Sequence, residues 1–223
     1  VAISGNTVLV CSDAHAGGVA RGGGAGYVYI RNDTTWTLEE ILYPHDLWKG
    51  DHFGASVDLD GDLAIIGAKF HDHIDSGFDS VSGYVHRRQG GSAYIFKRQG
   101  SSWFQEEELL ASDGEKDDTF GHSVAISVTH ANGKSNAKAV VGAWKDADIA
   151  ERSGAAYVFT RLSNGTWAES TKIVPVDLGH KFYFGGTVAI DIATGIVLAG
   201  AGAADGPNGP RSGAVYSIKM CNR

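Results

Sequence analysis

Phe-Gly occurs three times in this chain, and the residues around it return in the same order each time. The three pairs begin at Phe53, Phe120 and Phe184, 67 and 64 residues apart. Each pair is followed by an alternating run, an apolar run that ends in small residues, the motif Gly-x-x-Tyr and, in all but the last copy, a run opened by Trp. An earlier copy has these features without Phe-Gly. Such self-similarity indicates a repeat architecture, with copies at approximately 1–52, 53–119, 120–183 and 184–223.

Each copy predicts four β-strands. The first strand alternates polar and apolar residues, the second is almost continuously apolar, the third is aromatic and β-branched, and the fourth runs from Trp to a Leu or Ile. Short connections such as Asp60-Gly61-Asp62 favour antiparallel hairpins. We therefore predict an all-β single domain over 1–223, a β-propeller of about four antiparallel four-stranded blades. The last blade lacks its outer strand unless another segment or chain completes it.

Composition limits the partners. The net charge is −7 and no Lys/Arg cluster exceeds a pair, so nucleic acid is not expected as a partner. No apolar run reaches about 18 residues, so membrane insertion is not expected either. The two cysteines, Cys11 and Cys221, fall at opposite faces of the predicted propeller, so we expect no disulfide between them.

Three stretches of the third copy resemble the FG-GAP repeat: FGHSVAI (120–126), VVGAWKDAD (140–148) and SGAAYVF (153–159). This repeat is the blade unit of integrin α-subunit propellers and of many secreted proteins, and the resemblance covers nearly the whole chain. It implies a β-propeller with a binding role. The Pro of the family's Gly-Ala-Pro is absent from every copy. Integrin-type blades often carry a calcium loop, which only the segment from Asp58 through Asp60 to Asp62 approaches, and a hairpin turn explains that segment without a metal.

Strand direction sorts the connections. In antiparallel sheets the short turns fall on one face, and the long connections after the second and fourth strands fall on the other, here called the loop face. Loops on a rigid scaffold are where binding sites usually lie. The connection at 69–91 is expected to be a long irregular segment, and it is the best single candidate for a ligand site. A tolerated surface insertion explains its length equally well.

Acidic residues recur on the loop face, where oxygen ligands from neighbouring loops could hold a hard cation such as calcium. The candidates are Asp113, Asp117, Asp146 and Asp148. The competing explanation is that Asp begins turns by bonding to its own backbone.

His71-Asp72-His73, with Asp75, is the densest cluster of transition-metal ligands in the sequence. Alternate residues diverge unless the loop is bent, so a solvated or turn-bonded role competes with metal binding.

Other residues could contact an organic ligand or a glycan. Aromatic side chains can stack on a sugar, and a basic pair can attract an anion. The aromatic candidates are Trp48, Phe70, Trp144 and Tyr183, and the basic pair is Arg87-Arg88. Two N-glycosylation sequons, at Asn32 and Asn164, both fall in short turns opposite the loop face.

No Gly-x-Ser-x-Gly, His-Glu-x-x-His or P-loop pattern is present in the sequence. We predict a non-catalytic, secreted or cell-surface binding module of the adhesion class, which uses its loop face for a protein or glycan partner. The alternatives are a lectin-like module, a self-associating structural unit and a hydrolase with loop-face carboxylates. Calcium is the one cofactor that the sequence suggests.

Overall fold

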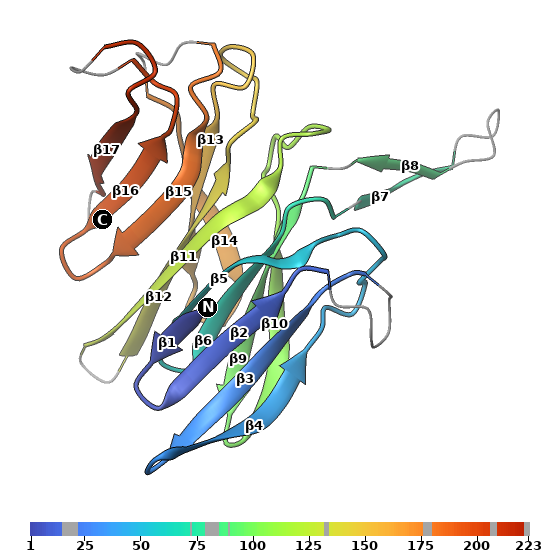
Figure 1. Ribbon diagram of the computed structural model, residues 1–223, viewed down its shortest axis with the longest axis vertical. Coiled ribbons are helices and arrows are strands. Elements are labelled where there is room, and N and C mark those ends of the chain that lie inside the picture. Colours follow the sequence, from blue (N-terminus) through green and yellow to red (C-terminus); the bar gives the residue numbers. More distant parts are fainter. Residues whose placement is uncertain are drawn as a thin grey trace.

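A computed structural model places most of the chain. It describes residues 1–14, 22–71, 73–78, 85–88, 90–131, 134–175, 180–205 and 209–220, with 73–78, 85–88, 131 and 134 described by their backbone alone. The described residues form β-strands and turns, without a helix. The strands make four antiparallel sheets that follow one another along the chain, as the colours of Figure 1 show.

The first three sheets have four strands each and the fourth has three. The first sheet comprises β1 (Ala2–Ser4), β2 (Thr7–Ser12), β3 (Ala25–Asn32) and β4 (Thr35–Leu42). The second comprises β5 (Phe53–Asp60), β6 (Leu63–Ala68), β9 (Ser92–Gln99) and β10 (Ser102–Leu109). The third comprises β11 (Phe120–Ala131), β12 (Lys134–Ala143), β13 (Ala155–Arg161) and β14 (Trp167–Ile173). The fourth comprises β15 (Phe184–Asp191), β16 (Ile196–Ala201) and β17 (Ala214–Lys219).

The architecture confirms the all-β, propeller-like fold predicted from the repeats, including a last blade of three strands. Each sheet is a meander in which every strand pairs with the preceding strand of its own sheet. The first strands of successive sheets contact one another, β5 with β1 and with β11, and β11 with β15. Successive blades are thus joined along their inner edges.

The connection between β6 and β9 differs from its prediction. It contains a two-stranded hairpin, β7 (His73–Phe78) and β8 (Val85–Arg88), that projects from the loop end of the second sheet (Figure 1). The expectation of an irregular segment over 69–91 is therefore wrong across these two strands. The reason is that the insertion pairs its own backbone groups, as a chain segment leaving the body of a fold must do unless water solvates them.

Phe-Gly joins each sheet to the one before it, and the junction between the third and fourth sheets shows how. The Phe184 backbone N–H donates to the Ser153 carbonyl at 2.9 Å. The Ser123 hydroxyl donates to the Gly185 carbonyl at 2.7 Å. A Cβ added to Gly142 would lie 2.0 Å from that same carbonyl oxygen, so the junction requires glycine there.

The other two junctions repeat the Phe N–H bond, and the junction between the second and third sheets also repeats the hydroxyl bond. Phe120 N–H donates to the Gly90 carbonyl at 2.8 Å, and Phe53 N–H donates to the Gly23 carbonyl at 2.9 Å. The Ser56 hydroxyl donates to the Gly121 carbonyl at 2.8 Å. The three Phe rings are fully buried, so each Phe-Gly combines an apolar anchor with a backbone clasp.

The core consists of three hydrophobic clusters. One contains residues of the first and second sheets, the next contains residues of the second and third sheets, and the last contains residues of the third and fourth sheets. An apolar second strand, such as β6 with all six residues buried, is covered on both faces by neighbouring sheets. Each sheet therefore depends on its neighbours for burial, as expected of a repeat fold.

The outer strands are joined by charged and aromatic side chains. The Trp167 indole N–H donates to Glu106 at 3.0 Å, and Arg161 makes a bidentate pair with the same carboxylate at 2.6 and 2.8 Å. Burial opposes ionisation of Glu106, but the bonds from Arg161 and Trp167 outweigh it and lower the pKa of this carboxyl. Trp36, the equivalent residue of the first sheet, is 42% exposed. Trp36 therefore lacks the burial of Trp103 and Trp167, because no described residue of an earlier sheet lies beside it.

Candidate functional site

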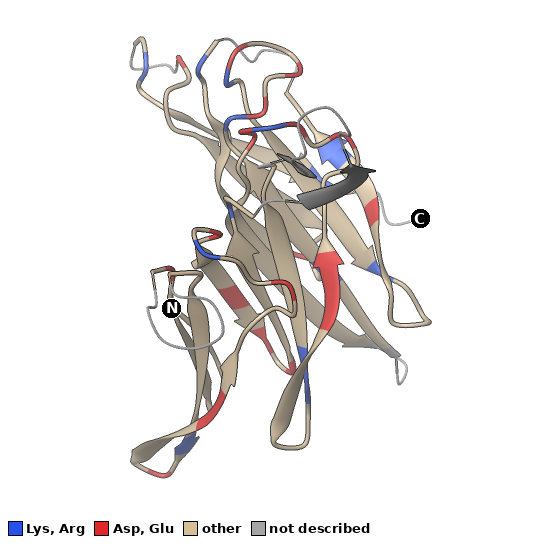
Figure 2. Ribbon diagram, turned by 90° about the vertical axis from the view of Figure 1, so that its right-hand side faces the viewer, with Lys and Arg blue, Asp and Glu red and all other residues tan. Residues whose placement is uncertain are grey.

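The loop face gathers the connections that follow the second and fourth strands of each sheet. In Figure 1 they lie at the upper end, together with the β7–β8 hairpin, and the short turns lie at the lower end. Figure 2 shows that acidic and basic residues both occur in these upper loops. Two polar clusters lie under them at equivalent places in the second and third sheets.

The second-sheet cluster consists of Asp46, Asp51, His71, Tyr94 and Glu108. His71 follows β6 and is buried, with Nδ1 2.9 Å from Asp51 Oδ2. Its Nε2 lies 3.5 Å from Asp46 Oδ2 and 3.8 Å from Glu108 Oε1. The Tyr94 hydroxyl donates to Asp46 Oδ1 at 3.1 Å. Three carboxylates therefore surround one imidazole.

Asp51 fixes the orientation of the imidazole. Its Oδ2 accepts the Trp48 backbone N–H at 2.7 Å as well as the bond from His71 Nδ1. With Nδ1 bonded to Asp51, Nε2 faces Asp46 and Glu108. Burial lowers the pKa of His71, but the hydrogen bond to Asp51 and the charges of Asp51, Asp46 and Glu108 outweigh it, so the pKa is raised.

The third-sheet cluster consists of Asp113, Asp146, Asp148, Tyr157 and Lys172. Lys172 Nζ donates to Asp113 at 2.8 Å, to Asp146 at 2.9 Å and to Asp148. The Tyr157 hydroxyl lies 2.8 Å from both Asp113 and Asp146. Burial opposes the charged form of Lys172, but these carboxylates outweigh it and raise the pKa of the ammonium.

Strand register makes the two clusters equivalent. Tyr94 pairs with Glu108 across β9 and β10, and Tyr157 pairs with Lys172 across β13 and β14. His71 and Asp146 both lie three residues after the last residue of the second strand of their sheet. The backbone carbonyl of each accepts the N–H of the glycine that opens Gly-x-x-Tyr, Gly91 for His71 and Gly154 for Asp146. The cationic and acidic positions are therefore exchanged: the second sheet has His after β6 and Glu on the outer strand, whereas the third has Asp after β12 and Lys on the outer strand.

The second-sheet cluster has the donor set of a metal centre. Asp46, His71 and Glu108 form the one group of three metal-ligating side chains, among the residues with described side chains, whose ligand atoms lie within 4.8 Å of one another. Neighbouring ligand atoms of tetrahedral zinc lie roughly 3.3 Å apart at the usual bond lengths of about 2.0 Å. Asp51 then has the place of the outer carboxylate that orients a metal-binding histidine.

The aspartates of the suggested calcium loop have other partners. Asp58 Oδ2 accepts the Ile126 backbone N–H at 2.8 Å, and Asp60 Oδ2 accepts the Val128 N–H at 2.7 Å. Burial raises the pKa of Asp58. These two carboxylates connect β5 to β11, and neither they nor Asp62 belong to the converging group found in the described part of the chain. Calcium at this turn stays a prediction.

Some of the remaining metal and anion candidates have described side chains, and the others do not. Asp113, Asp146 and Asp148 come together around Lys172, while Asp117 lies in the turn before β11 with φ of +71°. Asp72 lies outside the described residues. The side chains of four further candidates also lie outside the description, and these are His73, Asp75, Arg87 and Arg88.

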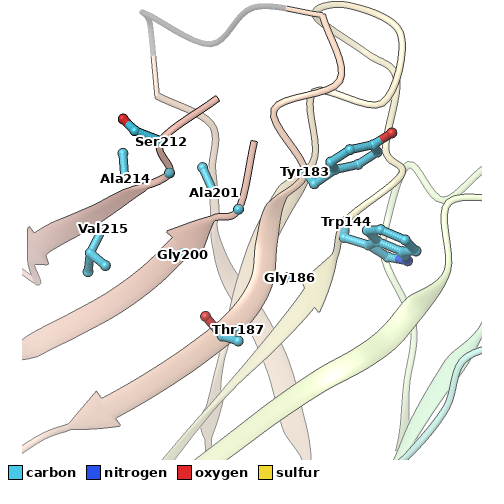
Figure 3. A pocket seen from close by; sticks show the side chains of 11 residues that line it. Trp144, Tyr183, Gly186, Thr187, Gly200, Ala201, Ser212, Ala214 and Val215 are labelled. Carbon is cyan, nitrogen blue, oxygen red and sulfur yellow. The ribbon is translucent and has the colours of Figure 1, made fainter. Parts of the chain in front are cut away.

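The structure brings two of the four aromatic candidates together. The rings of Trp144 and Tyr183 lie 5.0 Å apart between centroids, and His122 stacks on Trp144 at 4.7 Å. Trp144 and Tyr183 line one side of a cavity of about 660 Å³ whose other walls belong to the fourth sheet (Figure 3). Trp48 and Phe70 are exposed near the second-sheet cluster but form no such pair with each other among the described contacts.

Both sequons occur where the sequence places them. Asn32 ends β3 and is exposed, and Asn164 is exposed in the turn before β14. The Asn164 side chain accepts the Thr166 hydroxyl at 2.8 Å. Glycosylation of either site stays a prediction.

Cys11 packs against the hydrophobic cluster between the first and second sheets. Burial raises the pKa of its thiol to about 12. Cys221 lies outside the described residues, so the absence of a Cys11–Cys221 bond stays a prediction.

Sequence reasoning missed two residues of the clusters, Glu108 and Lys172, and the hydroxyl role of the repeated Tyr. The signal that identifies Glu108 is positional, since Glu108 and Lys172 both immediately precede the Leu or Ile that closes the fourth strand. Comparing the copies at that position shows a change of charge.

Comparison with known families identifies a repeat family. The family model of the FG-GAP repeat matches residues 36–96, 103–159 and 167–218. Each match begins on the fourth strand of one sheet and ends on the third strand of the next, so the matched unit spans a junction between sheets. No curated protein matches the chain. Among the described residues, no helix is long and apolar enough to span a membrane.

Proposed function

The chain belongs to the FG-GAP repeat family, and from this premise we propose that it is a non-catalytic extracellular binding module that engages a protein or glycan partner through its loop face. We further propose that the second-sheet cluster holds a divalent metal ion on that face. Repeats of this family are found in integrin-like extracellular adhesion proteins. The family is generally non-enzymatic.

One observation carries the metal proposal: the convergence of Asp46, His71 and Glu108. When Nδ1 of His71 donates to Asp51, a neutral imidazole presents an acceptor lone pair to two carboxylates. A metal ion bound at Nε2 would offset the repulsion between this lone pair and the two carboxylates, as a proton on Nε2 does in the metal-free protein. The third-sheet cluster supports the same conclusion, since there an ammonium group, that of Lys172, lies between the equivalent side chains.

The donor set favours zinc over calcium. Calcium takes six to eight oxygen ligands, whereas one imidazole with two carboxylates is a donor set typical of zinc and other borderline transition metals. With three protein ligands, a fourth position stays open to water or to an acidic group of a partner. A metal at the loop face would therefore give the module a specific point of attachment for an anionic ligand.

Titration calorimetry with Zn²⁺ tests the centre. The wild-type chain is expected to bind one zinc ion, and Asp46→Asn is expected to weaken that binding at least tenfold because it removes a ligand charge. The matched control is Asp113→Asn, the equivalent residue of the third-sheet cluster, which should leave zinc binding unchanged. Absence of binding to the wild type, or equal loss in both variants, contradicts the metal centre.

Binding of the secreted, fluorescently labelled protein to a panel of cell surfaces tests the wider function. We expect saturable binding that zinc increases, that a chelator decreases and that Asp46→Asn weakens while Asp113→Asn does not. Binding to no surface, or binding indifferent to metal and to both variants, contradicts a role for the loop face.

A further inference from the structure

On the loop face, the residue that follows the second strand of each of the first three sheets has a different chemistry. After β2 it is Asp13, whose Oδ2 lies 3.2 Å from Nδ1 of His52, the residue before the next Phe-Gly. After β12 it is Trp144, whose ring centroid lies 5.0 Å from that of Tyr183, again the residue before the next Phe-Gly (Figure 3). After β6 it is Lys69. Packing of the sheets therefore does not dictate the side chain at this position.

His122 adds a second difference between the copies. It follows Phe120-Gly121 at the start of β11, where the second and fourth sheets have Ala55 and Gly186. Its ring stacks on Trp144, with 4.7 Å between the centroids and 23° between the ring planes. Its Nδ1 is buried and has no hydrogen-bond partner among the described residues. A buried polar atom in this state costs free energy that a bound ligand would recover.

Two lysines bring positive charge to His122. Lys145 Nζ lies 5.5 Å from the centroid of the Trp144 ring, and Lys69 Nζ lies 5.4 Å from that of Phe70. Burial, followed by the charges of Lys69 and Lys145, lowers the pKa of His122, so both ammonium groups act on one imidazole. In the described part of the chain, neither lysine forms an ion pair.

The carboxylates of the adjoining turns have other partners. Asp118 accepts the Glu115 backbone N–H at 2.7 Å, and Asp146 accepts Lys172 Nζ at 2.9 Å. Two lysines, an imidazole and two aromatic rings thus come together without a described carboxylate paired to either lysine, in a chain of net charge −7. We call this group the aromatic-basic platform, and its members are Lys69, His122, Trp144, Lys145 and Tyr183.

The platform fits a ligand that has both an anionic group and an apolar ring face. An anion accepts hydrogen bonds from ammonium groups and from a ring N–H, which makes the bonds stronger than neutral ones. The planes of the Trp144 and Tyr183 rings are tilted by 44°. A flat aromatic ligand does not fit between them, because intercalation requires roughly 7 Å, twice the optimal carbon–carbon separation of about 3.5 Å. A pyranose ring, whose C–H groups form an apolar face, can pack on the outside of the pair.

We propose that the aromatic-basic platform binds an acidic sugar residue of a glycan. The carboxylate or sulfate group of the sugar would bond to Lys69, Lys145 and His122, and its ring would pack against Trp144 and Tyr183. This inference rests on the loop-face binding role proposed above, and it names the class of partner. It does not rest on the metal centre, because the platform shares no residue with the second-sheet cluster.

Calorimetry with acidic oligosaccharides and their neutral counterparts tests the platform, in the presence of EDTA so that no metal ion contributes. The acidic probes are sialyllactose, sulfated lactose and a hyaluronan tetrasaccharide, and the neutral ones are lactose and chitotetraose. We expect an acidic probe to bind about tenfold more tightly than its neutral counterpart. Comparing the two lactose derivatives shows whether a carboxylate or a sulfate is preferred. If no acidic probe binds, or if the neutral probes bind equally well, the proposal is overturned.

Variants assign the binding to the platform. Lys69→Met and Lys145→Met should each weaken binding of the preferred probe about tenfold, the size of one charge-assisted hydrogen bond. His122→Phe keeps a ring for stacking on Trp144 and removes the ring nitrogens, so a similar decrease in a folded protein separates ligand binding from packing. The matched control is Lys49→Met, which removes an exposed charge from the turn before β5 and should bind like the wild type. Equal weakening in all four variants would attribute the binding to the general charge of the loop face and overturn the proposal.

Two comparisons separate this inference from the function on which it rests. Asp46→Asn should leave binding of the acidic probe unchanged, because the measurement contains no free metal. A protein that binds cell surfaces but none of the acidic probes overturns the platform and retains the loop-face role, whereas binding of an acidic probe without cell-surface binding does the reverse. A hexaglutamate peptide that binds as tightly as the preferred probe and displaces it would make an acidic peptide the ligand, against the proposal.

Discussion

The second-sheet and third-sheet clusters occupy the same place in two copies of one blade, and they hold their charges by opposite means. In the third sheet a lysine on the outer strand supplies the cation, and the residue after β12 is an acid. In the second sheet the outer strand supplies an acid, and the residue after β6 is a histidine. Lys172 is charged at every physiological pH, whereas His71 can exchange its proton for a metal.

The two clusters share a structural role, the fixing of a turn, and differ in the charge of the residue on the outer strand. At each cluster an aspartate fixes the turn before the first strand of the sheet: Asp51 accepts the Trp48 N–H before β5, and Asp118, which lies beside the third-sheet cluster, accepts the Glu115 N–H before β11, each at 2.7 Å. That structural role requires only the aspartate at this position, Asp51 in one case and Asp118 in the other. The exchange of Glu108 for Lys172 leaves the turn in place and changes what the cluster can bind.

The largest expected effect is a loss of free energy of unfolding when Lys172, the cation of the third-sheet cluster, is replaced. Lys172→Met keeps the length of the side chain but leaves Asp146, which is buried, beside two other carboxylates. Loss of one partner of a buried ion pair typically costs about 3 kcal/mol. We expect a loss of that size in the free energy of unfolding, measured with urea at pH 7.

Lys181→Met is the control for Lys172→Met. Lys181 pairs with Glu151 on the surface at 3.3 Å, and such exposed pairs contribute less than about 1 kcal/mol. Equal losses in the two variants would show that the third-sheet cluster is not held by its lysine.

The sequence predicted the blades well because the fold depends on features that recur. Phe-Gly, the apolar second strand and Gly-x-x-Tyr each appear in at least three copies, so an error in one copy is corrected by the others. The loop face followed from the same regularity, since antiparallel strands leave no choice of end.

The candidate site was harder to predict because it depends on contacts between copies. Asp46, His71 and Glu108 come from three separate connections and strands, and no short motif contains two of them. His71 was singled out with Asp72 and His73, its neighbours in sequence, whereas its described partners are 20 to 37 residues away. The aspartates at 58 and 60 matched a calcium pattern locally, but their carboxylates bond to the backbone of β11.

A second variant converts one cluster into the other. Glu108→Lys places an ammonium group on β10 where Lys172 stands on β14, and it removes a proposed metal ligand. We expect zinc affinity to fall about 100-fold while the protein stays folded, because the new cation lies among carboxylates. Calorimetry measures the affinity and circular dichroism measures the fold.

Glu151→Lys makes the same change of charge at an exposed site on the loop face, and it should leave zinc affinity unchanged. A similar decrease in both variants would attribute the effect to the general electrostatic field and not to the loss of a ligand.

The smallest expected effect is a change in the free energy of unfolding at Asp118, whose equivalent in the turn before β5 is Asp51. Burial, reinforced by the charges of Asp146 and Asp148, raises the pKa of Asp118 to about 6 despite its backbone bond to Glu115. An acid whose pKa is higher in the folded state than its ordinary value of about 4 destabilises the fold once it ionises, so this penalty appears as pH rises from about 4 to 6. Asp118→Asn keeps the acceptor for Glu115 N–H. It should therefore match the wild type at pH 4 and exceed its stability by about 1 kcal/mol at pH 7.

Asp51→Asn supplies the contrast at the equivalent position. The Asp51 carboxylate bonds to His71, whose raised pKa depends on that charge, so its neutralisation should destabilise the metal-free protein most at pH values where His71 is protonated. Urea unfolding of both variants between pH 4 and 8 gives the comparison. Stabilisation by Asp118→Asn together with destabilisation by Asp51→Asn supports two clusters with opposite electrostatics. If both variants lose stability at pH 7, Asp118 is a structural carboxylate like Asp51, and the difference between the clusters reduces to the side chain on the outer strand.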